Sequence, residues 1–308
     1  MRSTVSYSND FLSSGHAYSV TRVKAMKALL FKKEDYDKML KMSLSEINRL
    51  LQENQYKKEI DFFASSNQGL MLTEMAITRN LESVFAKILG FSIQSSKGQI
   101  SLFLKKYDIF NITTILKGFR IKVDKQELKE DIIAAGSLKR EFLEKIINES
   151  NSFEDAVTAF RGTPYFKVIL KNQENLAQME DALFKDYFEE LIANGEEDLR
   201  NFALKQIKAY NSRQLIRKEK AEIHPVQIAG IKDSYVIPEA FKGKEEIYLL
   251  KQVLSENLKL LHIFKSSVGV LLAYFLAKEI EVRNLRFMAV GKNSNLSEEM
   301  IKENLVIA

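Results

Sequence analysis

The sequence predicts an all-helical protein built from similar units, and three observations support this fold class. Gly and Pro are sparse, with 12 and 3 among 308 residues, which leaves too few turn formers for a many-stranded sheet. Apolar side chains recur at helical spacing along most of the chain. One short pattern with an acidic residue and an asparagine occurs three times. We therefore expect helices throughout and essentially no sheet.

The repeated pattern is an acidic residue, two further residues, an asparagine and an apolar residue. Its three occurrences are Asp108 with Asn111, Asp198 with Asn201, and Glu281 with Asn284. They begin at intervals of 90 residues (108 to 198) and 83 residues (198 to 281). A second string, Ser43–Tyr56, aligns without gaps on Ser152–Tyr165. Because regular self-similarity is typical of repeat architectures, the chain is predicted to contain three related helical domains.

The first predicted domain covers residues 16–118 and follows a flexible N-terminus, residues 1–15, which is polar and contains several serines. From about Ser19, apolar residues recur at helical spacing with basic residues between them, which predicts a basic amphipathic helix. Ser43 with Glu46 three positions later matches a capping box, so another helix should begin there.

Two further helices are expected in this domain. An apolar stripe runs from Met71 to Leu89 and is followed by Gly90, a residue that often ends a helix. The first acid–asparagine pattern then lies within a further helix and is followed by Gly118. This helix closes the first predicted domain.

The second predicted domain covers residues 119–222 and begins with a polar connection over 119–126. Its most regular segment is 176–192, where one helical face stays apolar until Asn194–Gly195 ends it. A basic helix is predicted to follow, from about Asp198 to Lys220.

The third predicted domain covers residues 223–308 and follows the densest cluster of helix breakers, between 222 and 243. An apolar stripe over 247–264 predicts a helix. The most apolar run, 268–277, has ten residues, whereas a membrane-spanning helix needs about 20. This run therefore predicts a buried helix of a protein that does not cross a membrane.

Catalytic and metal-binding patterns are missing from the sequence. There is no Cys, which fits a cytosolic context, and the three histidines, His16, His224 and His262, are too scattered for a local metal site. Gly291-Lys292-Asn293 is not a phosphate loop, because that motif would need Gly at 286 and Ser or Thr at 293. An enzyme is the least favoured class, and we predict no catalytic residue, metal or cofactor.

The basic helix has two interpretations. Between 205 and 220 it carries six Lys and Arg residues and one acid, Glu219, so it could form a patch for phosphates or an acidic partner. The favoured interpretation is a solvated face whose cations suit the C-terminal end of the helix dipole. The net charge of +5 is modest, and no row of aromatic residues is interleaved for base stacking. Nucleic acid is therefore not a predicted partner.

The acid–asparagine pattern also has two interpretations. Asn is a poor helix-interior residue because its side chain competes for backbone hydrogen bonds, so each copy should bond something specific. The favoured interpretation is a buried polar contact that is repeated because the units are related. The alternative is a polar ring around a pseudo-threefold axis that grips a partner. In both cases the pattern is a structural or docking element.

Four segments are similar to those of a known family. They are Ala17-Tyr-Ser-Val-Thr-Arg-Val-Lys-Ala-Met-Lys-Ala-Leu-Leu30, Tyr107-Asp-Ile-Phe-Asn-Ile-Thr-Thr-Ile-Leu-Lys-Gly118, Glu279-Ile-Glu-Val-Arg-Asn-Leu-Arg-Phe-Met-Ala-Val-Gly-Lys292 and Ile301-Lys-Glu-Asn-Leu-Val306. With these segments the chain resembles, from about Ala17 to Val306, the C subunit of archaeal and bacterial A/V-type ATPases, relatives of the d subunit of eukaryotic V-ATPases.

The resemblance implies a funnel of three similar all-helical domains around a pseudo-threefold axis. It implies a non-catalytic central-stalk subunit of a proton- or sodium-translocating ATPase, a socket that links the rotor's axle to the membrane proteolipid ring and transmits torque. Such a subunit lies on the cytoplasmic face of the membrane within the complex, needs no cofactor, and is expected to be monomeric when isolated.

The role of two arginines and two other classes of protein stay open at the level of sequence. Arg283 and Arg286, beside the third acid–asparagine pattern, could help to dock the axle or the ring, or could instead pair with neighbouring acids on the surface. A free-standing helical-repeat adaptor that binds soluble partners would show the same periodicity, so it is the alternative function. A nucleic-acid binder would differ from both by steeply salt-sensitive binding.

Overall fold

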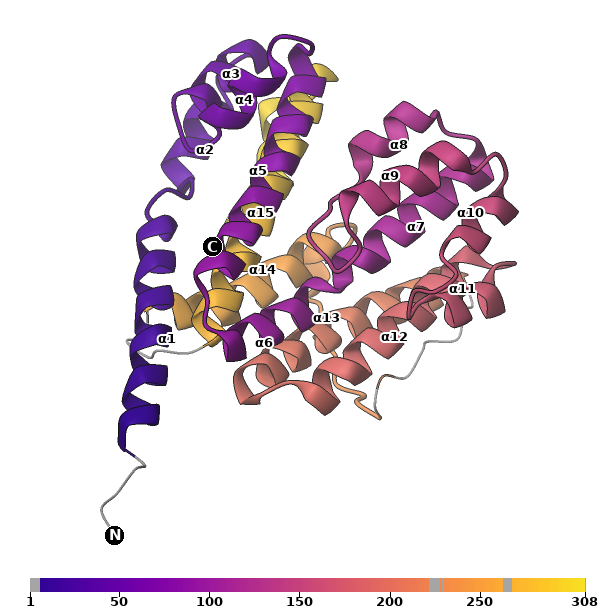
Figure 1. Cartoon of the computed structure of the whole chain (residues 1–308). Helices are drawn as coiled ribbons and strands as arrows, with labels where there is room; N and C mark the ends of the chain where they lie inside the picture. The colour runs from indigo at the N-terminus through magenta and orange to yellow at the C-terminus, as the bar shows by residue number, and fades with distance from the viewer. Residues whose placement is uncertain (1–5, 222–227, 229, 263–267, 308) are drawn as a thin grey trace. The chain divides into compact units, whose positions relative to one another are not determined.

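The computed structural model describes residues 6–221, 228, 230–262 and 268–307. Every regular element in these ranges is a helix, and the only other pairing there is an isolated bridge between Ile228 and Ile231. The predicted all-helical class is therefore confirmed for the described part of the chain (Figure 1). The chain forms two compact units, unit 1 (residues 1–97 with 235–308) and unit 2 (residues 98–234).

Unit 1 is assembled from both ends of the chain. Its N-terminal helices are α1 (Ser6–Lys27), α2 (Lys33–Met39), α3 (Leu44–Gln52), α4 (Lys57–Phe63) and α5 (Gly69–Phe91). Its C-terminal helices are η1 (Glu239–Phe241), α14 (Glu245–Leu258), η2 (Lys259–His262), α15 (Val268–Asn293) and α16 (Glu298–Glu303).

Unit 2 is continuous in sequence. Helix α6 (Gln94–Leu104) begins in unit 1 and ends in unit 2. The other helices of unit 2 are α7 (Lys106–Ile121), α8 (Lys125–Asp131), α9 (Arg140–Glu149), α10 (Phe153–Ala159), α11 (Phe166–Asn172), α12 (Leu176–Asn194) and α13 (Glu197–Ala221). The division into three domains with boundaries at 118 and 222 stays a prediction.

The core of unit 1 lies between helices α5 and α15, which run side by side (Figure 1). The first nine residues of the apolar run 268–277, Val268–Leu276, are all buried. Phe85 of α5 meets Phe275 edge to face, with ring centroids 4.5 Å apart. Among the described residues, no helix is both long and apolar enough to cross a bilayer. The prediction of a buried helix here is confirmed.

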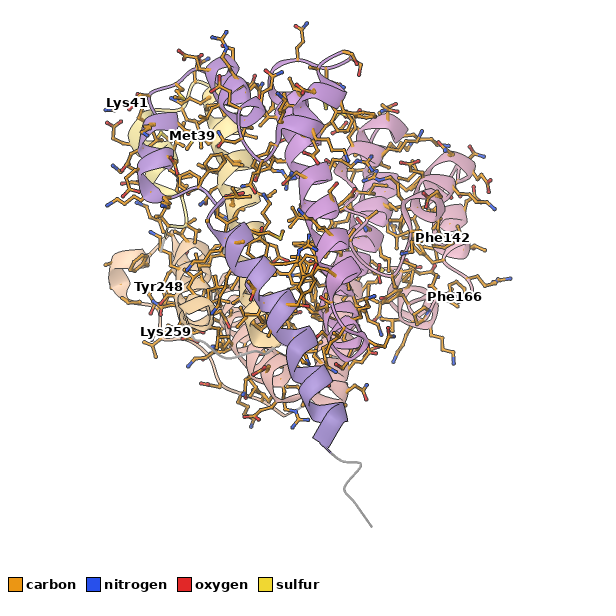
Figure 2. The ribbon with its side chains drawn as sticks, turned by 60° about the vertical axis from the view of Figure 1, so that its left-hand side comes forward. Met39, Lys41, Phe142, Phe166, Tyr248 and Lys259 are labelled. Carbon is orange, nitrogen blue, oxygen red and sulfur yellow. The ribbon has the colours of Figure 1, made fainter. Side chains whose placement is uncertain are left out.

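Other residues of unit 1 pack outside the α5–α15 core. The side chain of Met39 at the end of α2 is fully buried, whereas that of Lys41 beyond it is exposed (Figure 2). Tyr248 of α14 packs against Phe241 of η1, with ring centroids 4.8 Å apart. Helix α1 begins at Ser6, earlier than the predicted start near Ser19. The flexibility of residues 1–15 stays a prediction.

The core of unit 2 joins the end of α6 to helices α12 and α13. Phe103 meets Phe202 edge to face at 5.4 Å between ring centroids, and the Tyr187 hydroxyl donates to the Phe103 carbonyl at 2.9 Å. Helix α7 packs along α12. The Tyr187 hydroxyl is therefore buried together with the carbonyl that accepts its hydrogen bond. A buried hydroxyl needs such a partner.

The two aligned strings of the sequence have the same structure. Ser43 and Ser152 each cap a helix in a capping box, with Glu46 and Asp155 as the returning acids. At the same shift of 109 residues (43 to 152), α4 at 57–63 corresponds to α11 at 166–172. The sequence repeat is therefore also a structural repeat over this stretch.

Candidate functional site

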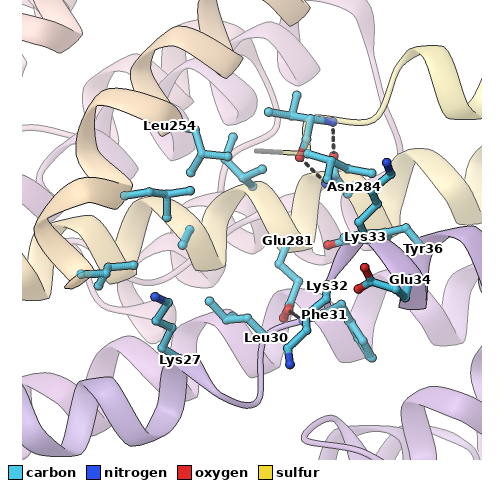
Figure 3. Close-up of a pocket in the computed structure, with 16 residues that line it drawn as sticks. Lys27, Leu30, Phe31, Lys32, Lys33, Glu34, Tyr36, Leu254, Glu281 and Asn284 are labelled. Carbon is cyan, nitrogen blue, oxygen red and sulfur yellow. Dashed lines mark hydrogen bonds between the residues drawn. The ribbon is translucent and has the colours of Figure 1, made fainter.

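Asn284, in the middle of α15, binds the backbone of the segment that follows α16. Its side-chain amide donates to the Val306 carbonyl at 2.8 Å, and its side-chain oxygen accepts from the Val306 amide at 2.9 Å (Figure 3). Asn284 and Val306 are both buried. The asparagine therefore supplies both hydrogen bonds that a buried extended backbone would otherwise lack.

Asn111, in α7, makes the same pair of bonds in unit 2. It donates to the Ile133 carbonyl at 2.8 Å and accepts from the Ile133 amide at 2.8 Å. In both units the asparagine and its partner are 22 positions apart. Two of the three predicted asparagines thus hold an extended segment to the helix that precedes it.

The acid of each pattern, one turn earlier on the same helix, collects donors from distant parts of its unit. Glu281 accepts from the Phe31 amide at 2.7 Å, the Tyr56 hydroxyl at 2.6 Å and the Lys278 ammonium at 2.8 Å. Gln55 adds a fourth bond at 2.9 Å. Since Glu281 is only 3% exposed, these bonds replace the water that its carboxylate would otherwise bind.

Asp108 is fully buried and has a similar set of donors. It accepts from the amides of Ser137 and Leu138 at 3.0 and 2.8 Å, and from the Tyr165 hydroxyl at 2.7 Å. The Ser137 hydroxyl donates as well, at 2.5 Å. Tyr56 and Tyr165 are the last residues of the two aligned strings, so equivalent tyrosines meet equivalent acids.

Burial sets the electrostatics of these clusters. Desolvation, followed by the negative charge of Glu281, raises the pKa of Tyr56 well above 10.0. Desolvation and then Asp108 likewise raise the pKa of Tyr165. Desolvation lowers the pKa of Lys278, although Glu281 acts against this effect. The tyrosines therefore stay neutral donors, which suits a fixed structural network better than proton transfer near neutral pH.

The equivalence extends along both helix pairs at a constant shift of 173 residues (108 to 281). Gly118 and Gly291 are the points of close approach: an added Cβ would overlap Leu128 in one unit and lie 2.8 Å from Ile301 in the other. The following turns contain the only non-Gly residues described with positive φ, Lys122 (60°) and Asn295 (55°). These six residues form three pairs, 118 with 291, 122 with 295 and 128 with 301, and each pair is 173 positions apart. Unit 2 therefore repeats, in one continuous stretch, a plan that unit 1 builds from both chain ends.

The second pattern, Asp198 with Asn201, is placed differently. Asp198 lies in the first turn of α13, where an acid is favoured by the helix dipole, and Asn201 is exposed. The structure therefore brings the first and third copies into equivalent buried clusters and leaves the second copy outside them. A buried acid on α12, Asp181, instead accepts from the Tyr210 hydroxyl at 2.5 Å and from Gln214 at 2.7 Å.

Arg283 and Arg286 are half-buried and bind groups of unit 1. Arg283 donates to the Asn304 carbonyl at 3.1 Å, and Arg286 donates to the Thr78 hydroxyl of α5 at 2.9 Å. Desolvation lowers the pKa of Arg283. In the basic helix, Lys208 lies 3.4 Å from Asp233, while the side chains of Arg217, Lys218 and Lys220 lie outside the described residues.

A cavity of about 500 Å³ lies beside the Glu281 cluster in unit 1 (Figure 3). Its polar side includes Glu281, Asn284 and Tyr36, and three lysines, Lys27, Lys32 and Lys33, stand along it. Among the described residues, no group of three His, Cys, Asp or Glu side chains could hold a metal ion. Through their hydrogen bonds to backbone groups, the clusters hold other chain segments in place.

Sequence reasoning missed the donors of these clusters. Lys278 is three positions before Glu281, and Lys105 stands at the same distance before Asp108, so the pattern could have been extended by one residue. Lys105 forms an ion pair with Glu190 at 2.5 Å instead of turning to Asp108. The tyrosines belong to the aligned strings, but no local signal indicates that their hydroxyl groups reach the acids.

The fold and the clusters define a class of protein. It is a helical protein in which the same arrangement of helices, with a buried acid and a buried asparagine, occurs in two units. Comparison with known proteins then gives its family. The profile described as the ATP synthase (C/AC39) subunit matches residues 19–228 and 215–304. The chain belongs to this family.

Curated relatives match over nearly their whole length. The C subunit of the A-type ATP synthase of Methanococcoides burtonii is 31% identical, with 96% of this chain and 95% of the relative covered. Its counterpart from Methanosarcina mazei is also 31% identical, with 96% and 94% covered. That of Archaeoglobus fulgidus is 29% identical, with 94% and 96% covered. The predicted resemblance is therefore confirmed.

Proposed function

We propose that this chain is the non-catalytic socket of a rotary A/V-type ATPase, linking the central axle to the membrane proteolipid ring and transmitting torque. The observation that carries the proposal is the match along 96% of the chain to a C subunit of an A-type ATP synthase. Catalysis would then belong to other subunits. The chain would lie on the cytoplasmic face of the membrane, as a peripheral part of the complex.

The internal structure of each unit supports a mechanical role. A part that passes torque must resist local bending, and close-packed helices deform little. Here the backbone between helices is itself held by buried side chains: Asn111 binds Ile133 and Asn284 binds Val306. Satisfied polar networks of this kind rigidify a core.

The proposal includes the finer architecture implied by the family. It comprises three similar domains around a pseudo-threefold axis, a funnel shape, and domain boundaries near residues 118 and 222. The shared plan of units 1 and 2 supports the idea of repetition within the chain. The acids and asparagines at 108, 111, 281 and 284 would serve this architecture as internal braces rather than as a partner-gripping ring.

Arg283 and Arg286 are proposed to contribute to docking through the part of each side chain that remains exposed. Both also brace unit 1, so their test must separate assembly from folding. The variant Arg283→Glu/Arg286→Glu should weaken rotor assembly, while the exposed pair Lys57→Glu/Lys58→Glu serves as a matched charge control. Helical content measured by circular dichroism reports folding. Normal assembly by a folded double variant would contradict a docking role.

The function is tested by a tagged pull-down from detergent-solubilised membranes of the source cells, analysed by native mass spectrometry. Recovery with a proteolipid ring and soluble ATPase subunits is the expected result. Recovery under gentle conditions with soluble partners alone would overturn the rotor proposal. That outcome would favour the alternative function, a free-standing helical-repeat adaptor.

A further inference from the structure

The two units differ at one place in their shared plan, and this place coincides with the cavity. In unit 2 the chain continues from Ile133 through Ala134–Leu138 into α9 and passes directly beside Asp108. The Ser137 and Leu138 amides bind the acid, and a Cβ on Gly136 would overlap its Oδ1. A short segment of turns and bends with small side chains therefore covers the buried acid of unit 2.

In unit 1 this covering segment has no counterpart among the described residues. Val306 corresponds to Ile133 and is held by Asn284 in the same way. The backbone amide that reaches Glu281 comes instead from Phe31, in the link between α1 and α2. The cavity lies between these two pieces of chain: Val306 and Ile307 line it together with Leu30 and Phe31 (Figure 3).

We propose that this cavity receives a short peptide segment of a partner protein, with small or apolar side chains next to an acidic residue. The segment would occupy in unit 1 the place that Ala134–Ser137 occupy in unit 2. A volume of about 500 Å³ falls within the usual range of ligand sites. Residues 134–137 of unit 2 thus serve as a template for the size of the proposed ligand.

The walls of the cavity indicate the apolar part of the ligand. Its apolar lining comes from α14, η2 and α15: Leu254, Leu258, Leu261, Ala277 and Ile280. Leu254 and Leu261 are buried, whereas Leu258 and Ala277 keep exposed area on the cavity side of the unit. Covering this surface with apolar side chains would remove it from water, which is the main driving force of such binding.

The charges beside the cavity indicate the acidic residue. Lys32 and Lys33 are exposed, and no carboxylate in the described part of the chain forms an ion pair with either. The charge of Glu281 is already met by Lys278 at 2.8 Å, which leaves Glu34 as the other acid of the lining. The lysines therefore favour a negative group on the ligand. Desolvation, then nearby Lys24, lowers the pKa of Lys27, which agrees with a surplus of positive charge here.

The test uses the full chain and a labelled synthetic peptide, acetyl-Glu-Ile-Ala-Ala-Gly-Ser-Leu, which places one acid before the residues found at 133–138. Fluorescence anisotropy should show saturable binding. Lys32→Glu/Lys33→Glu should weaken it about tenfold or more, since charge reversal replaces attraction with repulsion. Ala277→Leu, which fills the cavity without changing charge, should weaken it too. The control pair Lys57→Glu/Lys58→Glu should leave affinity unchanged.

Several results would overturn the proposal. They are a lack of saturable binding by the peptide, equal weakening by the 32/33 and 57/58 pairs, or saturation by dodecanoate without peptide binding, which would assign the cavity to an acyl chain. Circular dichroism verifies that each variant is folded. Because the isolated chain is used, failure here leaves the rotor proposal untouched, and failure of the pull-down leaves the peptide site untouched.

Discussion

At the scale of single residues, the contribution of an asparagine to stability depends on where its pattern lies in the fold. Asn284 satisfies both backbone groups of Val306 with one side chain. Asn201, which belongs to another copy of the pattern, is exposed. The same residue type in the same pattern therefore has very different importance in the two places.

This contrast gives a first prediction. Asn284→Ala should lower the free energy of unfolding by about 2–4 kcal/mol, because two buried backbone groups lose their partners. Asn201→Ala, the matched control, should change it by about 0.5 kcal/mol or less. Urea unfolding followed by circular dichroism measures both. Equal effects of the two substitutions would contradict a bracing role for Asn284.

Sequence reasoning located these asparagines but could not tell which copies are buried. The two copies with a common structure lie inside α7 and α15, whereas Asp198 begins α13 just after Gly195. An acid at a helix start is explained by the dipole alone, so the pattern carries no further meaning there. The donors could not be predicted from the sequence for another reason. Tyr56 and Glu281 are 225 positions apart, and no local pattern links them.

At the scale of elements, the repeated unit depends on two glycines that let a short helix approach a long one. Gly118 allows Leu128 of α8 to touch α7, and Gly291 allows Ile301 of α16 to touch α15. A third helical glycine, Gly90 in α5, has no atom within 4 Å of an added Cβ. The first two are needed for packing and the third is not.

Alanine substitutions separate these cases. Gly118→Ala and Gly291→Ala should each destabilise the protein by about 1–3 kcal/mol, because the added methyl group overfills a packed contact. Gly90→Ala should be neutral or stabilising by up to about 1 kcal/mol, since alanine favours the helix. Thermal unfolding would rank the three variants. Stabilisation by Gly291→Ala would show that α16 can shift away at little cost.

The sequence was most informative about helices and least informative about their grouping. The capping box at Ser43 and the buried helix at the apolar run are predicted from local signals, and the structure confirms both. Grouping depends on which apolar faces meet. The face of α15 is covered by α5, from the other end of the chain, and a scan along the sequence has no signal for such a long-range pairing.

At the scale of the whole molecule, buried tyrosines are expected to make the stability of the fold fall as the pH becomes alkaline. The pKa values of Tyr36, Tyr56 and Tyr274 in unit 1 and of Tyr165 in unit 2 are raised, first by desolvation and then by a nearby acid. Their folded-state pKa values lie above the unfolded value of 10.0. Their stabilising effect is therefore complete below pH 10 and is lost as pH rises through and beyond it.

The resulting prediction is a steep loss of stability above pH 10. Each tyrosine that ionises only in the unfolded chain removes about 1.4 kcal/mol per pH unit. Lys278 acts in the opposite direction, because its pKa is lowered and the unfolded chain binds its proton more tightly. One lysine offsets one tyrosine of unit 1 at most. Guanidinium midpoints at about pH 9 and about pH 11 test this balance, and equal midpoints would refute it.

The two units should also differ in their ability to fold alone. Unit 2 is continuous, so the fragment 98–234 should be helical and unfold cooperatively by circular dichroism. Unit 1 needs both chain ends, because the buried face of α15 is covered by α5, with Phe85 against Phe275. Fragments 1–97 and 235–308 should therefore aggregate or stay unfolded when separate, since each exposes a large apolar face. Co-expressed, they should elute together as a helical complex in size-exclusion chromatography. A fragment 235–308 that is folded and monomeric by itself would show that the plan shared with unit 2 does not determine how unit 1 folds.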